Sequence, residues 1–204
     1  MCPECWNELT PITKDDPTYL HKKSEIRYGD VIDDFLACFL FEKDKRIQDV
    51  MHGLKYEQKT SFGATLGKHL GKKMLTENIF TSADYLIPIP LHSLKLRERG
   101  YNQSECIASG ITSVTKIPIR TNILYRVRYT QSQTHLNFAE RQENVKDVFI
   151  AKKNSKKHID GKTIILVDDV MTTGATTLSA ASTLKKNGAK KILVATAALT
   201  EFEG

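Results

Sequence analysis

Apolar residues follow two patterns along this chain, one typical of buried strands and the other of helices. Continuous apolar runs predict buried strands at residues 35–41 and at Lys162–Val167. An apolar residue at every fourth position predicts a helix over Thr60–Glu77. The same reasoning predicts strands at Tyr85–Pro90, Ile123–Tyr125, Val145–Ile150 and Lys191–Thr196, and helices over Asn102–Thr115 and Gly174–Asn187.

The order of these elements indicates the fold class. Strands that alternate with helices predict an α/β fold, with a mainly parallel sheet covered by helices on both faces. Gly63, Gly67 and Gly71 form a second stripe on the Thr60–Glu77 helix, which indicates close contact with another backbone. Residues 13–25 are polar and show little periodicity, so we expect a small loop-rich lobe over 1–30 and the main domain over 31–204.

Composition and charge narrow the class of protein. The chain of 204 residues is 40% hydrophobic and carries a net charge of +6. No apolar run approaches the roughly 18 residues that a membrane helix needs, and the N-terminus lacks the pattern of a signal peptide, so we expect a cytoplasmic protein without a membrane partner. Residues 93–146 hold nine Lys and Arg but four Asp and Glu, which fits either a solvated face or an anion site.

Two aspartates follow the predicted strand that ends at Val167. The next residues are Thr172-Thr173-Gly174-Ala175-Thr176, at the predicted start of a helix. In open α/β sheets ligands bind at the carboxyl ends of strands, and a helix N-terminus offers N–H groups and positive dipole to phosphate. Carboxylates would repel phosphate, so Asp168 and Asp169 suit ribose hydroxyls, held directly or through Mg²⁺. The alternative is a strand, loop and helix with a capping threonine and two solvated aspartates.

The ordered combination from Asp168 to Thr176 resembles the phosphoribosyl pyrophosphate loop of type I phosphoribosyltransferases. Further stretches resemble the ComF-like branch of that superfamily, a group of amidophosphoribosyltransferase-related competence proteins. These are His52–Tyr56, Ile87–His92, Leu96–Gln103, Gln133-Thr134, Glu140-Arg141 and Asn144-Val145.

The resemblance implies roles for single residues. Asp168 and Asp169 would hold the ribose 2′ and 3′ hydroxyls and, indirectly, Mg²⁺. Arg97 and Arg99 follow the segment that corresponds to the pyrophosphate loop, so they would contact pyrophosphate and act in catalysis. The segment from Arg126 to Arg141 corresponds to a flexible loop that closes over the reaction. The remaining substrate-binding residues implied by the resemblance are Val170, Met171, Thr172, Thr173, Gly174, Ala175, Thr176, Pro90, Leu91, His92, Gln133 and Arg141.

Four cysteines are too few and too scattered for a disulfide framework. Cys38 and Cys106 lie in apolar surroundings and are expected in the core. Cys2 and Cys5 have the spacing of a metal knuckle, but Zn²⁺ needs four ligands. ComF-like proteins commonly open with a zinc ribbon, and Cys2–Leu9 looks like its second half, which implies a first pair upstream. We therefore expect an incomplete site that binds zinc only if upstream ligands are supplied, with His21 as a distant candidate ligand.

Two functions from different classes follow. The first is an enzyme that binds phosphoribosyl pyrophosphate and Mg²⁺ and transfers the phosphoribosyl group to an acceptor. The alternative is a module without turnover that senses the ligand or binds single-stranded DNA weakly through its basic surface. Glutaminase activity is not expected, because about 30 loop-like residues cannot build a glutaminase domain. Neither the acceptor nor the oligomeric state is indicated by any motif.

Overall fold

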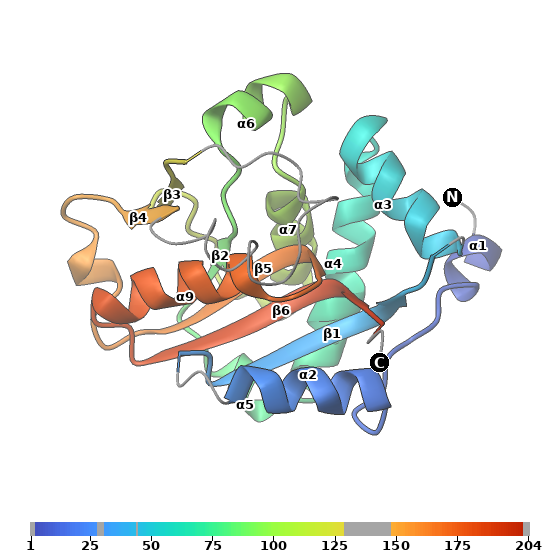
Figure 1. Ribbon diagram of the computed structural model, residues 1–204, viewed down its shortest axis with the longest axis horizontal. Helices are drawn as coiled ribbons and strands as arrows, with labels where there is room; N and C mark the ends of the chain where they lie inside the picture. Colours follow the sequence, from blue (N-terminus) through green and yellow to red (C-terminus); the bar gives the residue numbers. More distant parts are fainter. Residues whose placement is uncertain (1–2, 28–30, 44, 129–147, 202–204) are drawn as a thin grey trace.

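Four parallel strands form the central sheet, in the spatial order β1, β6, β5, β2 (Figure 1). The computed structural model describes residues 3–27, 31–43, 45–128 and 148–201. A separate two-stranded sheet pairs β3 and β4 antiparallel. The strands are β1 (Asp34–Phe41), β2 (Tyr85–Pro88), β3 (Leu124–Arg126), β4 (Phe149–Ala151), β5 (Thr163–Met171) and β6 (Lys191–Thr200).

Helices cover both faces of the central sheet. Side chains alternate across each strand, so Leu36 and Cys38 of β1 enter one apolar cluster while Phe35 and Ala37 enter another. Helices α3 (Arg46–Tyr56), α4 (Thr60–Leu75) and α7 (Gln103–Thr115) complete the first cluster. Helices α2 (Pro17–Arg27) and α9 (Ala175–Lys186) complete the second. The predicted α/β fold with a parallel sheet and two covered faces is therefore confirmed.

Among the described residues, four short helical segments lie before or between these elements. They are α1 (Pro3–Asn7), α5 (Asn78–Thr81), α6 (Ser93–Arg99) and the 3-10 turn η1 (Lys156–His158). Over the described ranges, no helix combines the length and the apolar character that crossing a bilayer requires.

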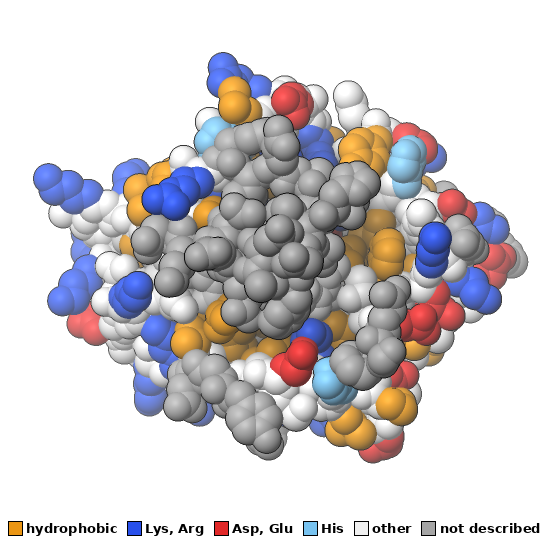
Figure 2. All heavy atoms as spheres, viewed as in Figure 1, with side chains coloured by type: hydrophobic (Ala, Val, Ile, Leu, Met, Phe, Trp, Pro, Cys, Tyr) orange, Lys and Arg blue, Asp and Glu red, His pale blue; other side chains and the backbone are white. Residues whose placement is uncertain are grey.

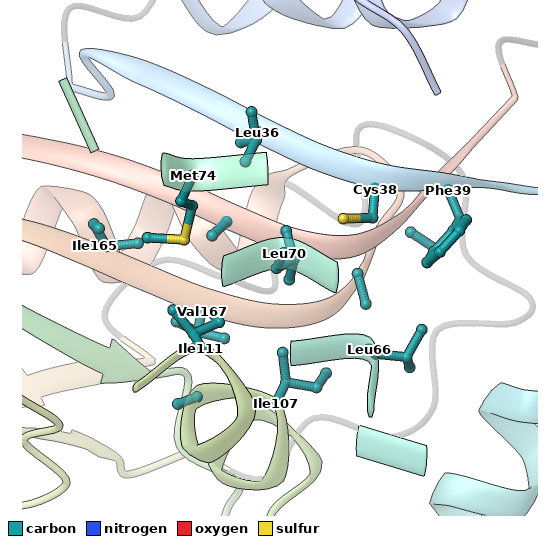
Figure 3. Close-up of a cluster of buried hydrophobic side chains, with 14 of the residues drawn as sticks. Leu36, Cys38, Phe39, Leu66, Leu70, Met74, Ile107, Ile111, Ile165 and Val167 are labelled. Carbon is teal, nitrogen blue, oxygen red and sulfur yellow. The ribbon is translucent and has the colours of Figure 1, made fainter. Parts of the chain in front are cut away.

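The first apolar cluster shows why α4 carries a glycine stripe. Figure 3 shows Leu66, Leu70 and Met74 of α4 facing the sheet, with Ile107 and Ile111 of α7 beside them. A Cβ atom at Gly67 would lie 2.0 Å from the Ile107 carbonyl oxygen. On the facing helix, a Cβ at Gly110 would lie 2.1 Å from the Ala64 carbonyl oxygen. The close backbone contact that the sequence indicated is confirmed, and α7 is the helix in contact.

The N-terminal segment differs from the loop-rich stretch that its sequence indicated, because residues 17–27 form α2. The Asp16 carboxylate accepts the Thr18 N–H at 2.9 Å and so caps the helix, with Pro17 in its first turn. Tyr19 anchors α2: its ring stacks on Phe35 with centroids 4.6 Å apart, and its hydroxyl donates to the Phe35 carbonyl at 2.8 Å. A helix held mainly by one buried tyrosine shows little apolar periodicity. The domain boundary near residue 30 remains a prediction.

Strand β5 is longer than its apolar run. Its pairing with β6 continues past Val167, with Asp168 opposite Thr196 and Met171 opposite Leu199. The two aspartates therefore lie within the last part of β5 that still pairs with β6, rather than in the loop that follows. Because β6 keeps pairing to this point, the backbone of the acidic pair is fixed by the sheet.

Candidate functional site

The acidic pair of β5 is held by neighbouring elements. Ser104, in the first turn of α7, donates its hydroxyl to Asp168 Oδ1 at 3.3 Å. The Asp169 N–H donates to the same oxygen at 3.0 Å. Asp169 Oδ1 accepts the Val170 N–H at 2.7 Å. The α7 contact depends on the Asn102 cap, whose side chain accepts the Ser104 N–H at 3.1 Å and donates to the Ile89 carbonyl at 3.0 Å.

A lysine from another part of the chain completes the acidic pair. Lys55 Nζ, at the last turn of α3, lies 2.9 Å from Asp169 Oδ2. Burial lowers the pKa of Lys55, but attraction to Asp169 and Asp168 outweighs this and leaves it raised. Burial and the Asp169 charge together raise the pKa of Asp168 to about 7. The charge of Asp169 thus disfavours the ionised form of Asp168.

The acidic pair opens into a pocket of about 240 Å³ that also contains four cations. Lys55 comes from α3, Lys95 and Arg99 from α6, and Arg126 from β3. Figure 1 shows α6 and one end of α3 above the carboxyl edge of the sheet. The other lining residues are Tyr56, Ile89, Leu91, Gln103, Ser104, Asp168, Asp169, Val170 and Thr176.

Burial shapes the cationic side of the pocket as well. The pKa of Arg126 is lowered by burial, although the Asp168 charge opposes this shift. The pKa of Lys95 is lowered by burial and then by repulsion from Arg126 and Arg99. Arg99 lies over the Tyr56 ring, 5.7 Å from its centroid, so the end of α3 and the end of α6 share one wall. A negatively charged ligand would stabilise all of these cations.

The loop from β5 to α9 has the geometry of a phosphate cradle. Gly174 has a φ of 79°, in the left-handed region, and the first helical bond of α9 runs from the Leu178 N–H to the Gly174 carbonyl at 2.8 Å. The backbone N–H groups of the first turn have no helical acceptor, as at every helix start. Thr176, in that first turn, lines the pocket. Anion-binding groups therefore lie directly beside the acidic pair.

Comparison with known proteins shows which family this chain resembles. A family model described as "Phosphoribosyl transferase domain" matches residues 111–201, which include β5, the acidic pair and α9. Competence protein F of Haemophilus influenzae is 35% identical over 109 residues, covering 53% of this chain and 47% of that protein. Competence protein ComFC of Bacillus subtilis is 29% identical over 189 residues, covering 92% of this chain and 67% of that protein.

Residues 111–201 of this ComF-like chain thus resemble a phosphoribosyltransferase domain, and its longer matches are to competence proteins. "DNA utilization protein YhgH" of Escherichia coli K12 is also similar, 26% identical over 151 residues, which are 72% of this chain and 65% of that protein. The chain thus spans about half to two thirds of the length of these curated relatives.

Two solved structures resemble this ComF-like chain in part. Glutamine phosphoribosylpyrophosphate amidotransferase from Bacillus subtilis, complexed with ADP and GMP, has a TM-score of 0.43 and 24% identity, over 66% of this chain and 26% of that chain. Purine phosphoribosyltransferase from Pyrococcus horikoshii has a TM-score of 0.38 and 17% identity, over 64% of this chain and 71% of that chain.

The structure brings together some of the residues that the ComF-like resemblance had singled out. Arg99, Leu91, Val170 and Thr176 line the pocket with the acidic pair, and Pro90 lies between two lining residues. His92 instead caps α6, where its Nδ1 accepts the Leu94 N–H at 3.3 Å.

Other residues of that set lie elsewhere. Arg97 is exposed and is absent from the described residues that line this pocket. Met171 is 1% exposed, so its side chain belongs to the core and only its backbone faces the loop. Thr172, Thr173, Gly174 and Ala175 form the turn into α9, where Thr173 Oγ1 accepts the Ala175 N–H at 3.4 Å. Gln133 and Arg141 lie outside the described residues.

Six pocket residues carried no role in the sequence interpretation: Lys55, Tyr56, Ile89, Lys95, Gln103 and Ser104. Lys55 and Tyr56 belong to His52–Tyr56, a stretch that carried the ComF-like resemblance, so a signal for them existed. Ser104 follows the Leu96–Gln103 stretch directly. Arg126 was expected at the start of the flexible loop, which is wrong, because it is the last residue of β3 and pairs with Phe149.

The donors fit the magnesium ion that the family implies. Mg²⁺ is usually held by one or two carboxylates and completes its shell with water and ligand phosphates. Asp168 and Asp169 supply two such carboxylates, and a bound cation would favour the ionised form of Asp168, which burial and the Asp169 charge disfavour. Among the described residues there is no group of three or more His, Cys, Asp or Glu arranged for a metal. Magnesium would therefore depend on the acidic pair and on the ligand.

The three described cysteines of this ComF-like chain, Cys5, Cys38 and Cys106, are absent from the lining of the pocket. Cys5 lies half-buried in α1, and Cys2 lies outside the described residues, so zinc binding by the pair stays a prediction. Cys38 is buried in the first apolar cluster as predicted, and burial raises the pKa of its thiol to about 12. Cys106 is half-buried and packs on the same cluster.

Proposed function

We propose that this chain binds phosphoribosyl pyrophosphate with Mg²⁺ in the pocket at the end of β5 and transfers the phosphoribosyl group to an acceptor. One observation carries the proposal: two carboxylates and four cationic side chains line the same pocket, beside the first turn of α9. A ribose diol suits carboxylate acceptors, and phosphate groups suit cations and helix N–H groups. A ligand that joins a diol to phosphates at both ends matches this division.

In the proposed reaction, a nucleophile attacks the anomeric carbon of the sugar while the bond from that carbon to pyrophosphate breaks, with inversion at the carbon. Asp168 and Asp169 accept hydrogen bonds from the 2′ and 3′ hydroxyls and so fix the ring. The loop from Thr172 to Thr176 holds the 5′-phosphate. Lys95, Arg99 and Arg126 stabilise the negative charge of the departing pyrophosphate. Bound Mg²⁺ would supply further positive charge to the same group.

The test is isothermal titration calorimetry with phosphoribosyl pyrophosphate and Mg²⁺, followed by a screen of acceptors for pyrophosphate release. The variant Asp168→Asn with Asp169→Asn should lose binding and keep its fold, as judged by its circular dichroism. Asp160→Asn changes an exposed aspartate outside the lining of the pocket and serves as the matched control. Binding by the double variant as tight as that of the parent would show that the site is assigned wrongly.

A second candidate function is binding of single-stranded DNA. The relatives named competence protein and DNA utilization protein favour it, and so does a cluster of lysines far from the pocket. These lysines lie between β4 and η1, on η1, at the end of α9 and around the start of β6, and we refer to them as the basic edge. Figure 2 shows Lys and Arg side chains gathered along the left of that view, where Figure 1 places these segments. The basic edge consists of Lys152, Lys153, Lys156, Lys157, Lys186, Lys190 and Lys191.

The two candidate functions predict different ligands, bound at different places on the molecule. An enzyme should release pyrophosphate with an acceptor and depend on the acidic pair. A binding module should retain DNA when the acidic pair is replaced, and it should show no turnover. A cytoplasmic location belongs to both proposals.

A further inference from the structure

Lys55 forms an ion pair with Asp169, one of the two carboxylates proposed to bind the ribose hydroxyls. Both oxygens of Asp169 are engaged in the described structure, Oδ2 by Lys55 Nζ at 2.9 Å and Oδ1 by the Val170 N–H at 2.7 Å. The backbone donor belongs to the sheet and stays in place. The lysine is the contact that can be exchanged.

The backbone that carries Lys55 is fixed, so an exchange would involve its side chain alone. The Tyr101 hydroxyl donates to the carbonyl of Leu54, the residue just before it. Arg99 lies over the ring of Tyr56, the residue just after it. At the other end of α3, Arg46 pairs with Glu8 at 2.9 Å. A lysine side chain has a flexible four-carbon stem, so its ammonium can leave one partner for another nearby while α3 stays still.

A ligand bound in the same pocket would offer Lys55 a different partner, one of its phosphates. The ammonium lines the cavity together with Lys95, Arg99 and Arg126, which form the side proposed to receive phosphates. Its side chain is 28% exposed, so it reaches the cavity from the protein wall. A ligand phosphate would therefore give Lys55 a negatively charged partner at the moment when Asp169 gains a different cation.

We propose that Lys55 is a resident counter-cation of Asp169, which a divalent cation must displace and which then moves to the phosphates of the ligand. This inference rests on the proposed function for the identity of the ligand. It adds an order of events: the divalent cation binds weakly by itself and tightly together with a phosphorylated sugar. Lys55 is then a positioning residue that links the two.

The first experiment measures Mn²⁺ alone, by electron paramagnetic resonance, against the parent and three variants. Lys55→Met removes the competing charge, so Mn²⁺ should bind about tenfold tighter, the value of one charge-assisted bond. Lys55→Arg keeps the charge and should bind Mn²⁺ within about twofold of the parent. Lys68→Met is the control, since Lys68 is an exposed lysine of α4 outside the lining of the pocket; it should also stay within about twofold.

The second experiment measures ribose 5-phosphate and inorganic pyrophosphate by calorimetry in the presence of Mg²⁺. Lys55→Met should bind at least one of these anions about tenfold more weakly than the parent. The opposite signs of the two effects distinguish a counter-cation from a lysine that only supports the fold, because a distorted site would weaken metal and anion alike.

A measurement on the parent avoids any folding defect of the variants. Saturating Mg²⁺ with pyrophosphate should change the rate at which the Lys55 amine is methylated under reducing conditions, as read by mass spectrometry, while Lys68 on the surface of α4 stays unchanged.

The proposal is overturned if Lys55→Met binds Mn²⁺ no more tightly than the parent, including the case in which neither binds it. It is also overturned if Lys55 methylation is unaffected by the ligands. Failure of the proposed function gives a different result: the parent would not bind phosphoribosyl pyrophosphate or ribose 5-phosphate at all, whereas the Mn²⁺ comparison would still decide the role of Lys55.

Discussion

At the scale of single residues, the pocket holds charges of both signs in surroundings that disfavour them. Burial raises the pKa of Asp168, and burial lowers the pKa of Arg126 and of Lys95. Attraction to Asp169 outweighs burial only at Lys55, whose pKa is raised, and the other three groups keep the shift that burial causes. A ligand with hydroxyls for the carboxylates and phosphates for the cations would relieve both sides, so the free site is built for such a ligand at some cost in stability.

Two neighbouring arginines should differ in their effect on pyrophosphate binding. Residues two apart on a helix do not face the same side, so Arg99 lines the pocket while Arg97 points to solvent. Arg99→Met should weaken binding of inorganic pyrophosphate about tenfold or more, and Arg97→Met by less than about twofold. Calorimetry of both variants at one salt concentration measures the difference. Equal losses would mean that the two arginines act only through the general field.

The pKa of Asp168 predicts how stability changes with pH. Its carboxyl has an ordinary pKa of 3.8 and a pKa of about 7 in the folded protein. Between these values the folded state keeps a proton that the unfolded state has lost, so stability falls as pH rises through this window. Asp168→Asn removes the titrating group, so the ligand-free variant should gain stability relative to the parent as pH rises from 4 to 8.

Melting temperatures of the parent and of Asp168→Asn at several pH values test this, with an expected shift of roughly 2–4 °C for each kcal/mol. Asp160→Asn, at an exposed position, should show no such trend. A difference between Asp168→Asn and the parent that stays constant across the window would contradict the prediction.

At the scale of elements, packing of helices on the sheet places the site. Ser104, which donates to Asp168, belongs to α7, and the position of α7 depends on its contact with α4. That contact requires glycine on both helices, since a Cβ at Gly67 or at Gly110 would meet a backbone carbonyl of the other helix. The α4 glycines therefore act on the acidic pair through α7.

Gly67→Ala should destabilise the protein by about 1–3 kcal/mol, because the helices must separate to admit the methyl group. The better helix propensity of alanine offsets roughly 1 kcal/mol of this loss. The midpoint of urea unfolding measures the effect. Lys68→Ala, at the next and exposed position of α4, should change stability by less than about 0.5 kcal/mol. A neutral Gly67→Ala would show that the two helices are not in the described contact.

The helices and strands also show which parts of the fold the sequence pattern predicts. Strands β1, β5 and β6 are buried on both faces, so each appears as an apolar run. The sequence pattern did not predict α2, because Tyr19 is the one buried residue among its described side chains while Leu20 is 52% exposed. The extension of β5 beyond Val167 was missed because Asp168 and Asp169 interrupt its apolar run.

The same contrast applies to the site. Asp168, Asp169 and Thr176 are contiguous in sequence, so a local motif reveals them. Lys55 and Arg126 reach the pocket from α3 and β3, and their place depends on how distant elements cross the sheet. No local pattern states which face of α3 turns toward β5.

At the scale of the whole molecule, the pocket and the basic edge lie at opposite ends of the central strands. Asp168 and Asp169 are near the carboxyl end of β5, whereas Lys191 pairs with Thr163 at its beginning. Residues 152–191 contain nine lysines against three aspartates, two of which are the acidic pair. The basic edge can therefore bind a polyanion without blocking the pocket. Binding at one end of the strands need not compete with binding at the other.

This separation predicts weak DNA binding that depends on salt and is independent of the pocket. Lysines that contact phosphates release counterions, and each contact contributes about −0.7 to the slope of log affinity against log salt for single strands. Fluorescence anisotropy with labelled oligothymidine should show affinity falling steeply with salt, and phosphoribosyl pyrophosphate should not displace the DNA. Lys156→Glu with Lys157→Glu should weaken binding, while Lys68→Glu with Lys72→Glu, the same charge change on α4, should weaken it far less. Nanomolar binding that persists in high salt would contradict this and favour a nucleic-acid module over an enzyme, because charge contacts alone cannot survive screening.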